Sequence, residues 1–237
     1  MKRFNEEYRR VPTAHDFASL LNPSGLIPIA ILVGLSACAP EPNDTEPESL
    51  PTLGPQSQVV PSLGLPEQIT IQEANNNLDV IAHQGRVYLA FRTAPEHFAS
   101  AETELHVVSS TDQENWTHEA TFFEATDLRE PRFLSLDDQL FLYFAVLGDN
   151  PLAFEPQGSR VSVLQDGSWS EAAEIFDADF IPWRARVIEG VPMLMGYTGG
   201  GELYDLEDSL PEIEVKWLTS TDGWTWEALI AGTETVH

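Results

Sequence analysis

Short runs of β-branched, aromatic and leucine residues fill the chain from Gln68 onward. Gly, Asp, Asn or Pro separates one run from the next. This pattern predicts β-strands, and no segment keeps the apolar period of about 3.6 residues that an amphipathic helix needs. The clearest predicted strands are 86–92, 105–109, 139–144, 159–164, 191–197 and 214–219. We therefore expect an all-β domain.

The predicted strands recur in a unit of about 50–55 residues that closes on a turn followed by Trp. In each unit a first strand leads through a tight turn into an aromatic-rich strand. A longer loop, a third strand and the turn before Trp follow. Self-similarity on this scale predicts a β-propeller of four-stranded antiparallel blades. The blades are expected at 67–125, 126–178 and 179–237.

Two of the turns before Trp share a motif. Residues 110–116 read Ser-Thr-Asp-x-x-x-Trp, and residues 220–226 read the same with Gly after Asp. The motif resembles the Asp box of the sialidase superfamily, whose boxes are structural. The Asp carboxylate is expected to accept backbone N–H groups of its own turn, and the Trp to pack on neighbouring strands. Four residues are thus expected to serve the fold: Asp112, Trp116, Asp222 and Trp226.

Three units are fewer than the about four to eight blades that close a propeller ring. We therefore expect an incomplete ring of about three blades, truncated from a larger, five-bladed design. The alternative is an open-edged molecule that needs a partner to cover its exposed strands.

The apolar run 26–38 ends in Leu-Ser-Ala-Cys and holds the only cysteine, Cys38. Its length is typical of a secretory signal and too short to span a bilayer as a helix. The last four residues resemble the lipobox of bacterial lipoproteins, which implies cleavage and lipidation at Cys38. Residues 1–38 are then a signal that leads to the bacterial cell envelope, with a lipid anchor at the outer membrane or cell surface. The alternative is a buried strand with a core cysteine.

Proline recurs through residues 39–66, with acidic and small polar residues between. Such a segment buries too little apolar surface to offset its ordering entropy, and its prolines favour an extended chain. We expect a disordered tether that leads to a propeller at 67–237.

The formal net charge is −26, and four of the 12 basic residues precede Cys38. So acidic a chain repels phosphates, which excludes nucleic acid as a partner. The six histidines lack metal-ligand spacing, and no glycine-rich phosphate loop is present. We therefore expect no metal and no cofactor.

The first strand of each unit begins where the inner strands of a propeller converge. Arginines gather there although the chain is acidic, which indicates a bound anion or carboxylate. The candidate substrate-binding residues are Arg92, His97, Arg129, Arg132, Trp183, Arg184, Arg186 and Tyr197. The alternative is that the arginines pair with local acids in a buried ion network.

Arg129-Glu130-Pro131 resembles the Arg-Asp-Pro motif of the second blade in five-bladed glycoside hydrolases, the arabinanase, levansucrase and invertase group. The resemblance implies that Asp79 is the catalytic base or nucleophile and that Glu130 stabilises the transition state. The proton donor of that group has no counterpart here, because the third-unit position holds Arg184. A sialidase-like mechanism would use the arginines as a clamp on the substrate carboxylate.

Two classes of function stay open. The chain is a sialidase-like or furanosidase-like glycoside hydrolase, whose partner is a glycan or a carboxylate-bearing sugar. Alternatively it is a non-catalytic glycan- or protein-binding module, or a structural envelope lipoprotein. The missing third carboxylate favours the binding module.

Overall fold

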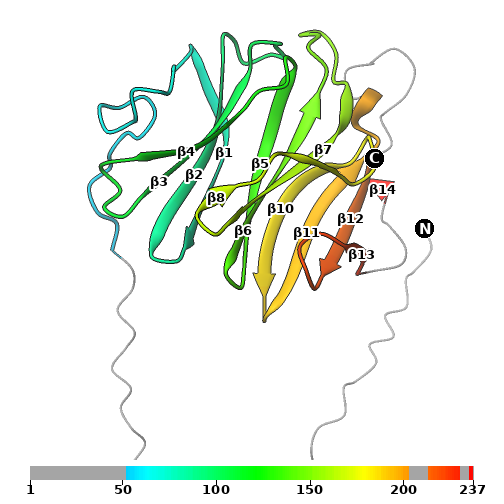
Figure 1. The fold of residues 1–237 in the computed structure, drawn as a ribbon. Coiled ribbons are helices and arrows are strands. Elements are labelled where there is room, and N and C mark those ends of the chain that lie inside the picture. The colour runs from blue at the N-terminus through cyan, green and yellow to red at the C-terminus, as the bar shows by residue number, and fades with distance from the viewer. Residues whose placement is uncertain (1–51, 203–212, 230–234, 237) are drawn as a thin grey trace, which may run out of the picture. The chain divides into compact units, whose positions relative to one another are not determined.

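A computed structural model describes residues 52–202, 213–229 and 235–236, and those from Pro55 onward belong to one compact unit. Within these ranges, fourteen strands form three antiparallel sheets that stand side by side (Figure 1). This arrangement confirms the all-β class and the three units expected from the repeat. The expected signal segment and lipidation site, residues 1–38, lie outside the described residues. Within the described part, no helix is long and apolar enough to cross a membrane.

Each sheet has four strand positions, numbered from the inner strand outward. The first sheet holds β1 (Ala74–His83), β2 (Arg86–Ala94), β3 (Glu104–Ser110) and β4 (Thr117–Phe122). The second holds β5 (Asp127–Leu136), β6 (Gln139–Leu147), β7 (Pro156–Gln165), β8 (Ser168–Trp169) and β9 (Ala173–Ile175). The third holds β10 (Ile181–Ile188), β11 (Val191–Thr198), β12 (Ile213–Ser220), β13 (Trp226–Ala228) and β14 (Thr235–Val236), with a short 3-10 helix, η1 (Gly200–Glu202), after β11. In the second and third sheets, two short strands share the outer position.

The inner strands β1, β5 and β10 lie next to one another and carry the same irregularity. Each has one extra residue near its start, where the pairing register with the next strand shifts. At two of these bulges a non-glycine residue takes a positive φ, 45° at Asn77 and 52° at Glu130. A bulge of this kind redirects side chains away from the regular alternation. The bulges therefore decide which residues meet at this end of the sheets.

Two apolar cores hold the sheets together. Between the first and second sheets, buried residues such as Leu105, Leu128 and Phe144 pack together. Between the second and third sheets, Phe141 and Tyr143 pack with residues of β10 and β11. Burial of each large apolar side chain contributes about 1.5–3 kcal/mol, so both cores stabilise the contacts between the sheets.

The segment before β1 covers the outer face of the first sheet. Val59, Val60 and Leu65 pack against buried residues of β2 and β3, and the Trp116 amide donates to the Gly64 carbonyl at 2.9 Å. The sequence places the end of the tether at Pro66, whereas in the structure the folded part already includes these residues. This segment has too little apolar surface to fold alone, and packing against the sheet beneath it stabilises it.

Both Asp-box turns have the geometry that their motif indicates. Asp112 Oδ1 accepts hydrogen bonds from the backbone amides of residues 114 and 115, at 2.9 and 2.8 Å. In the second turn, Asp222 Oδ1 accepts hydrogen bonds from the amides of residues 224 and 225, at 2.8 and 2.7 Å. Hydrogen bonds lower the pKa of both carboxyl groups, with the Asn115 side chain as the largest cause at Asp112 and the Thr225 amide at Asp222. Trp116 and Trp226 pack against the cores of their sheets. All four residues act in the fold.

Candidate functional site

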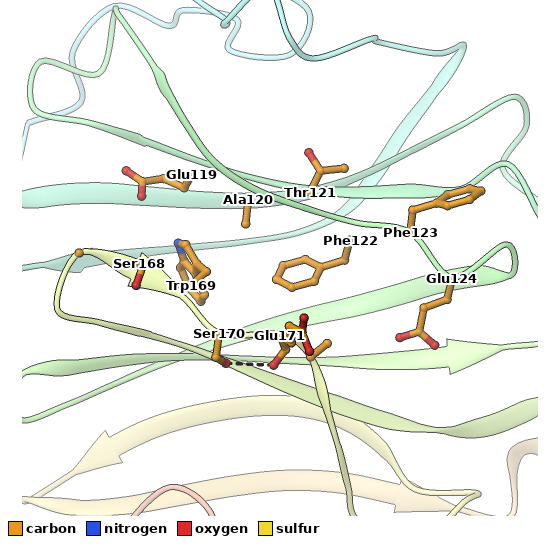
Figure 2. Close-up of a pocket in the computed structure, with 12 residues that line it drawn as sticks. Glu119, Ala120, Thr121, Phe122, Phe123, Glu124, Ser168, Trp169, Ser170 and Glu171 are labelled. Carbon is orange, nitrogen blue, oxygen red and sulfur yellow. Dashed lines mark hydrogen bonds between the residues drawn. The ribbon is translucent and has the colours of Figure 1, made fainter.

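Two of the hollows in the described surface differ in position and lining. A groove of about 610 Å³ lies at the outer rim, between β4 and β8 (Figure 2). A pocket of about 330 Å³ lies on the third sheet and includes Trp183 and Tyr197. The residues expected from the sequence gather at the second hollow and at the inner-strand bulges beside it.

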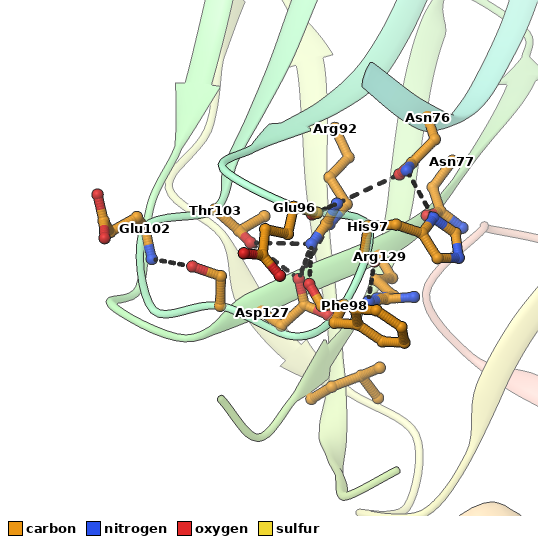
Figure 3. A network of polar contacts seen from close by, with 12 residues as sticks. Asn76, Asn77, Arg92, Glu96, His97, Phe98, Glu102, Thr103, Asp127 and Arg129 are labelled. Atoms are coloured by element: carbon orange, nitrogen blue, oxygen red, sulfur yellow. Dashed lines mark hydrogen bonds and ion pairs between the residues drawn. The ribbon is translucent and has the colours of Figure 1, made fainter. Parts of the chain in front are cut away.

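Arg92 on β2 is the centre of a buried polar network (Figure 3). Its side chain is fully buried, and its Nε and Nη2 atoms donate to Asp127 Oδ1 at 2.9 and 2.8 Å. Further donations reach the Phe98 carbonyl at 2.9 Å and Asn76 Oδ1 at 3.3 Å. Burial lowers the pKa of Arg92, and Asp127 opposes that change. Arg92 thus joins β1, the loop after β2 and the start of β5, and it is not available to a ligand.

Arg129 and His97 complete the exposed side of this network. Arg129 forms an ion pair with Asp127 through Nε and donates from Nη2 to the His97 carbonyl at 2.8 Å. The His97 ring meets the Asn76 side chain, with 2.9 Å between Nδ1 and Nδ2. The predicted residues Arg92, His97 and Arg129 are therefore brought together, with Asp127 as the common acid of the two arginines.

Glu130 and Arg132 form a second ion pair at the bulge of β5. Glu130 also accepts a hydrogen bond from Asn77 Nδ2 of the first sheet. Arg132 donates to the Trp183 carbonyl of the third sheet, and its guanidinium carbon lies 6.0 Å from the Trp183 ring centre. This pair connects the three inner strands. Both Glu130 oxygens are engaged by protein donors.

Asp79 lies apart from these clusters. It is buried on β1, and its Oδ2 accepts the Phe133 amide of β5 at 2.9 Å. This contact fixes the first sheet against the second. The expected role of Asp79 as catalytic base needs a carboxylate that faces a ligand, and the observed role is a contact between sheets.

The pocket on the third sheet is almost wholly apolar. Trp183 is 47% exposed and meets Tyr197 edge to face, with ring centres 5.8 Å apart. The other lining residues are Met195, Gly196, Ile213 and Val215. Because Trp183 also contacts Arg132, the pocket adjoins the ion pair at the β5 bulge.

Arg184 and Arg186 differ from the other arginines of the described chain. Arg184 has no polar partner among the described residues, and Arg186 donates only to the Ala185 carbonyl at 3.2 Å. Every other arginine in this part forms an ion pair with a carboxylate. Arg184 pairs across the sheet with Met195, so the two side chains share the face on which the pocket opens. Within the described part of the chain, a cation without an acidic partner therefore lies beside an exposed aromatic pocket.

Asn76, Asn77 and Asp127 belong to the site but were not among the residues predicted from the sequence. Asn is unfavourable in strands, so three consecutive Asn residues at 75–77 could have indicated an irregular strand start. Asp127 is the first residue of β5 and is fully buried, and a buried acid requires a partner. Within the described residues, no group of three His, Cys, Asp or Glu side chains could hold a metal ion.

The fold is similar to that of known glycoside hydrolases. Trypanosoma rangeli sialidase in complex with sialic acid matches with a TM-score of 0.50 and 12% sequence identity, over 65% of this chain and 30% of that chain. Zg3597, a family 117 glycoside hydrolase from the marine bacterium Zobellia galactanivorans, matches with a TM-score of 0.48 and 13% identity, over 65% and 55% of the two chains. A thermostable family-43 glycoside hydrolase matches with a TM-score of 0.44 and 11% identity, over 69% and 55%.

The sialidase match shows a β-propeller fold of the glycoside-hydrolase type over part of the chain. This chain spans about a third of the sialidase and about half of the other two. No protein-family model matches the sequence, and no curated protein matches it.

Proposed function

We propose that this chain is a lipid-anchored propeller protein that binds an acidic glycan at the Trp183 pocket. The observation that carries the proposal is Arg184, which has no acidic partner among the described residues and lies beside an exposed aromatic pocket, in a chain of net charge −26. In such a chain a cation without an acidic partner is unusual, and a bound carboxylate would supply that partner.

The chemistry of the pocket fits a sugar acid. The apolar C–H faces of a sugar ring pack on exposed aromatic side chains such as Trp183 and Tyr197, because the faces of aromatic rings carry partial negative charge. The guanidinium of Arg184 can hold a carboxylate in two parallel hydrogen bonds. An apolar pocket with a few polar groups at its edge is the usual form of a small-molecule site.

Binding fits this site better than hydrolysis. A glycoside hydrolase needs two carboxyl groups that flank the scissile bond. The two carboxylates that the sequence offered are both engaged, Glu130 by Asn77 and Arg132 and Asp79 by the Phe133 amide. The sialidase with the similar fold binds sialic acid, which makes that acid the first ligand to test.

The proposed location is the bacterial cell envelope, with lipid on Cys38. The proposal rests on the lipobox resemblance at 35–38 and on the acidic, proline-rich segment that follows it. Intact mass spectrometry of the protein from a bacterial membrane fraction tests it. We expect a mass that begins at a lipidated Cys38, and Cys38→Ser should move the protein to the soluble fraction. An unmodified Cys38 in membrane-extracted protein contradicts the anchor.

Isothermal titration calorimetry with sialyllactose and lactose tests the binding site, since the two probes differ only by the acidic sugar. We expect sialyllactose to bind and lactose to bind at least about tenfold more weakly. Arg184→Gln should remove this preference. Arg160→Gln, which changes the charge equally at the outer rim, should leave it in place.

Equal affinity for the two probes, or equal effects of the two variants, contradicts the proposed site. Lactose released from sialyllactose by the wild-type chain would establish hydrolysis in place of binding alone. Binding of neither probe would leave the protein-binding and structural alternatives as the better accounts.

A further inference from the structure

The groove between β4 and β8 is separate from the Trp183 pocket and is built differently. Its volume is about 610 Å³, and its walls are residues 119–124 and 167–172. We call it the outer groove. Figure 2 shows Phe122 and Trp169 between the two walls, where both side chains pack against the core of the first and second sheets. The groove therefore has an apolar floor between two outer strands.

One wall of the outer groove is an unpaired strand edge. β4 is the last strand of the first sheet and pairs only with β3. No backbone hydrogen bond joins it to β8 or to the residues that follow β8 in the described structure. Half of its backbone N–H and C=O groups therefore point away from the sheet. A free edge of this kind is a template for an added strand.

The floor of the outer groove holds an unsatisfied donor. The indole Nε1 of Trp169 is buried and has no hydrogen-bond partner in the described chain. Buried Trp N–H groups usually find an acceptor, because a lost hydrogen bond is costly in an apolar setting. A peptide carbonyl that enters the groove would supply this acceptor.

The charge at the outer groove is acidic. Its lining contains Glu119, Glu124 and Glu171 and no lysine or arginine. Arg86 and Arg160 reach the first two glutamates from neighbouring strands. Glu171 is exposed, and no cation in the described residues faces its carboxylate. A partner with basic side chains complements this rim and the net charge of −26.

We propose that the outer groove binds an extended, basic peptide segment of a partner protein, which adds a strand to the free edge of β4. In this arrangement the peptide backbone pairs with β4. Alternate apolar side chains enter the groove towards Phe122 and Trp169, because successive side chains of a strand point to opposite faces. Basic side chains between them lie near Glu171. The proposal does not depend on the glycan site.

Fluorescence anisotropy with the full chain and a fluorescein-labelled peptide of sequence KVKFKVK tests the proposal. Salt at about 0.15 M screens non-specific attraction to the acidic surface. A second peptide with N-methyl groups on alternate amides keeps the charge and the apolar side chains but cannot pair along one edge. A third, EVEFEVE, keeps the alternation and reverses the charge. We expect saturable binding of the first peptide and at least about tenfold weaker binding of the other two.

Two protein variants locate the site. Glu171→Lys should weaken binding several-fold, while Glu227→Lys, an equal charge change on exposed β13, should not. Trp169→Phe removes the indole donor, keeps an aromatic ring and should also weaken binding. Equal binding of the N-methylated peptide, equal effects of the two lysine variants, or no binding of the first peptide overturns the proposal.

Discussion

At the scale of single residues, the arginines divide into two groups by their surroundings. Arg92, Arg129 and Arg132 are committed to carboxylates and hold loops and strands together. Arg184 and Arg186 have no carboxylate partner in the described chain. The sequence alone presented all five as equivalent candidates. The ion-network alternative thus holds for Arg92, Arg129 and Arg132, and the ligand clamp stays a proposal for Arg184 and Arg186.

The first prediction compares Arg92→Met with Arg184→Met. The first change leaves the fully buried Asp127 without its main partner, which should lower the free energy of unfolding by about 3–5 kcal/mol. The second change removes an exposed side chain and should alter the free energy of unfolding by less than about 0.5 kcal/mol. Urea denaturation measures both.

The double variant Arg92→Met, Asp127→Leu is the control for this comparison. It removes the buried charge along with its partner, so part of the lost stability should return. Equal stability of the two single variants would mean that the buried ion pair does not hold the loop after β2.

The second prediction concerns His106 and the pH dependence of the free energy of unfolding. Burial lowers its pKa, and Glu104 only partly opposes this. In the unfolded chain the imidazole binds a proton near pH 6.5, whereas in the folded chain it does so only at a lower pH. The free energy of unfolding should therefore fall as the pH drops below about 6.5. His106→Gln keeps a side-chain contact with Thr121 available and removes this titration.

Thermal unfolding of both proteins between about pH 7.5 and pH 5 measures the difference. The wild type should lose more stability over this range than His106→Gln, and the remaining slope includes His83, whose pKa is also lowered by burial. If the stability of the two proteins changed with pH in parallel, His106 would not contribute to the pH dependence and the prediction would be wrong.

At the scale of elements, the two Asp-box turns show why one motif carries different residues. The fourth position is Gln113 with φ 63° in the first turn and Gly223 with φ 74° in the second. The backbone alone therefore tolerates a side chain there. At Gly223 an added Cβ would lie 2.6 Å from the ring of the buried Phe141. Contact with the neighbouring sheet, rather than the turn itself, requires glycine.

The third prediction follows from this contact. Gly223→Ala should destabilise the protein more than Gly190→Ala, although both glycines have a positive φ. A Cβ at Gly190 meets open space, so that change should cost only the backbone strain, about 1 kcal/mol. Differential scanning calorimetry of the two variants measures the gap. Equal melting temperatures would show that Phe141 moves aside at little cost.

At the scale of the whole molecule, the repeat of strands and turns was enough to predict three sheets, since each unit carries its own local pattern. The network around Arg92 could not be predicted in this way, because Asp127 is 35 residues away and belongs to another sheet. The composition of the segment near Val59 is that of a tether, and its apolar residues gain burial only once the first sheet exists. Local patterns predict elements, and contacts between elements need the assembled fold.

The measurement that tests the central claim most directly is an NMR titration of ¹⁵N-labelled tryptophan side chains with sialyllactose. The chain has six Trp residues, and only Trp183 lines the proposed glycan pocket. We expect the indole signal of Trp183 to shift on titration, while those of Trp116 and Trp169, in the first and second sheets, stay in place. Assignment uses single Trp→Phe variants. An unmoved Trp183 signal, or shifts confined to the other tryptophans, would contradict a glycan site on the third sheet.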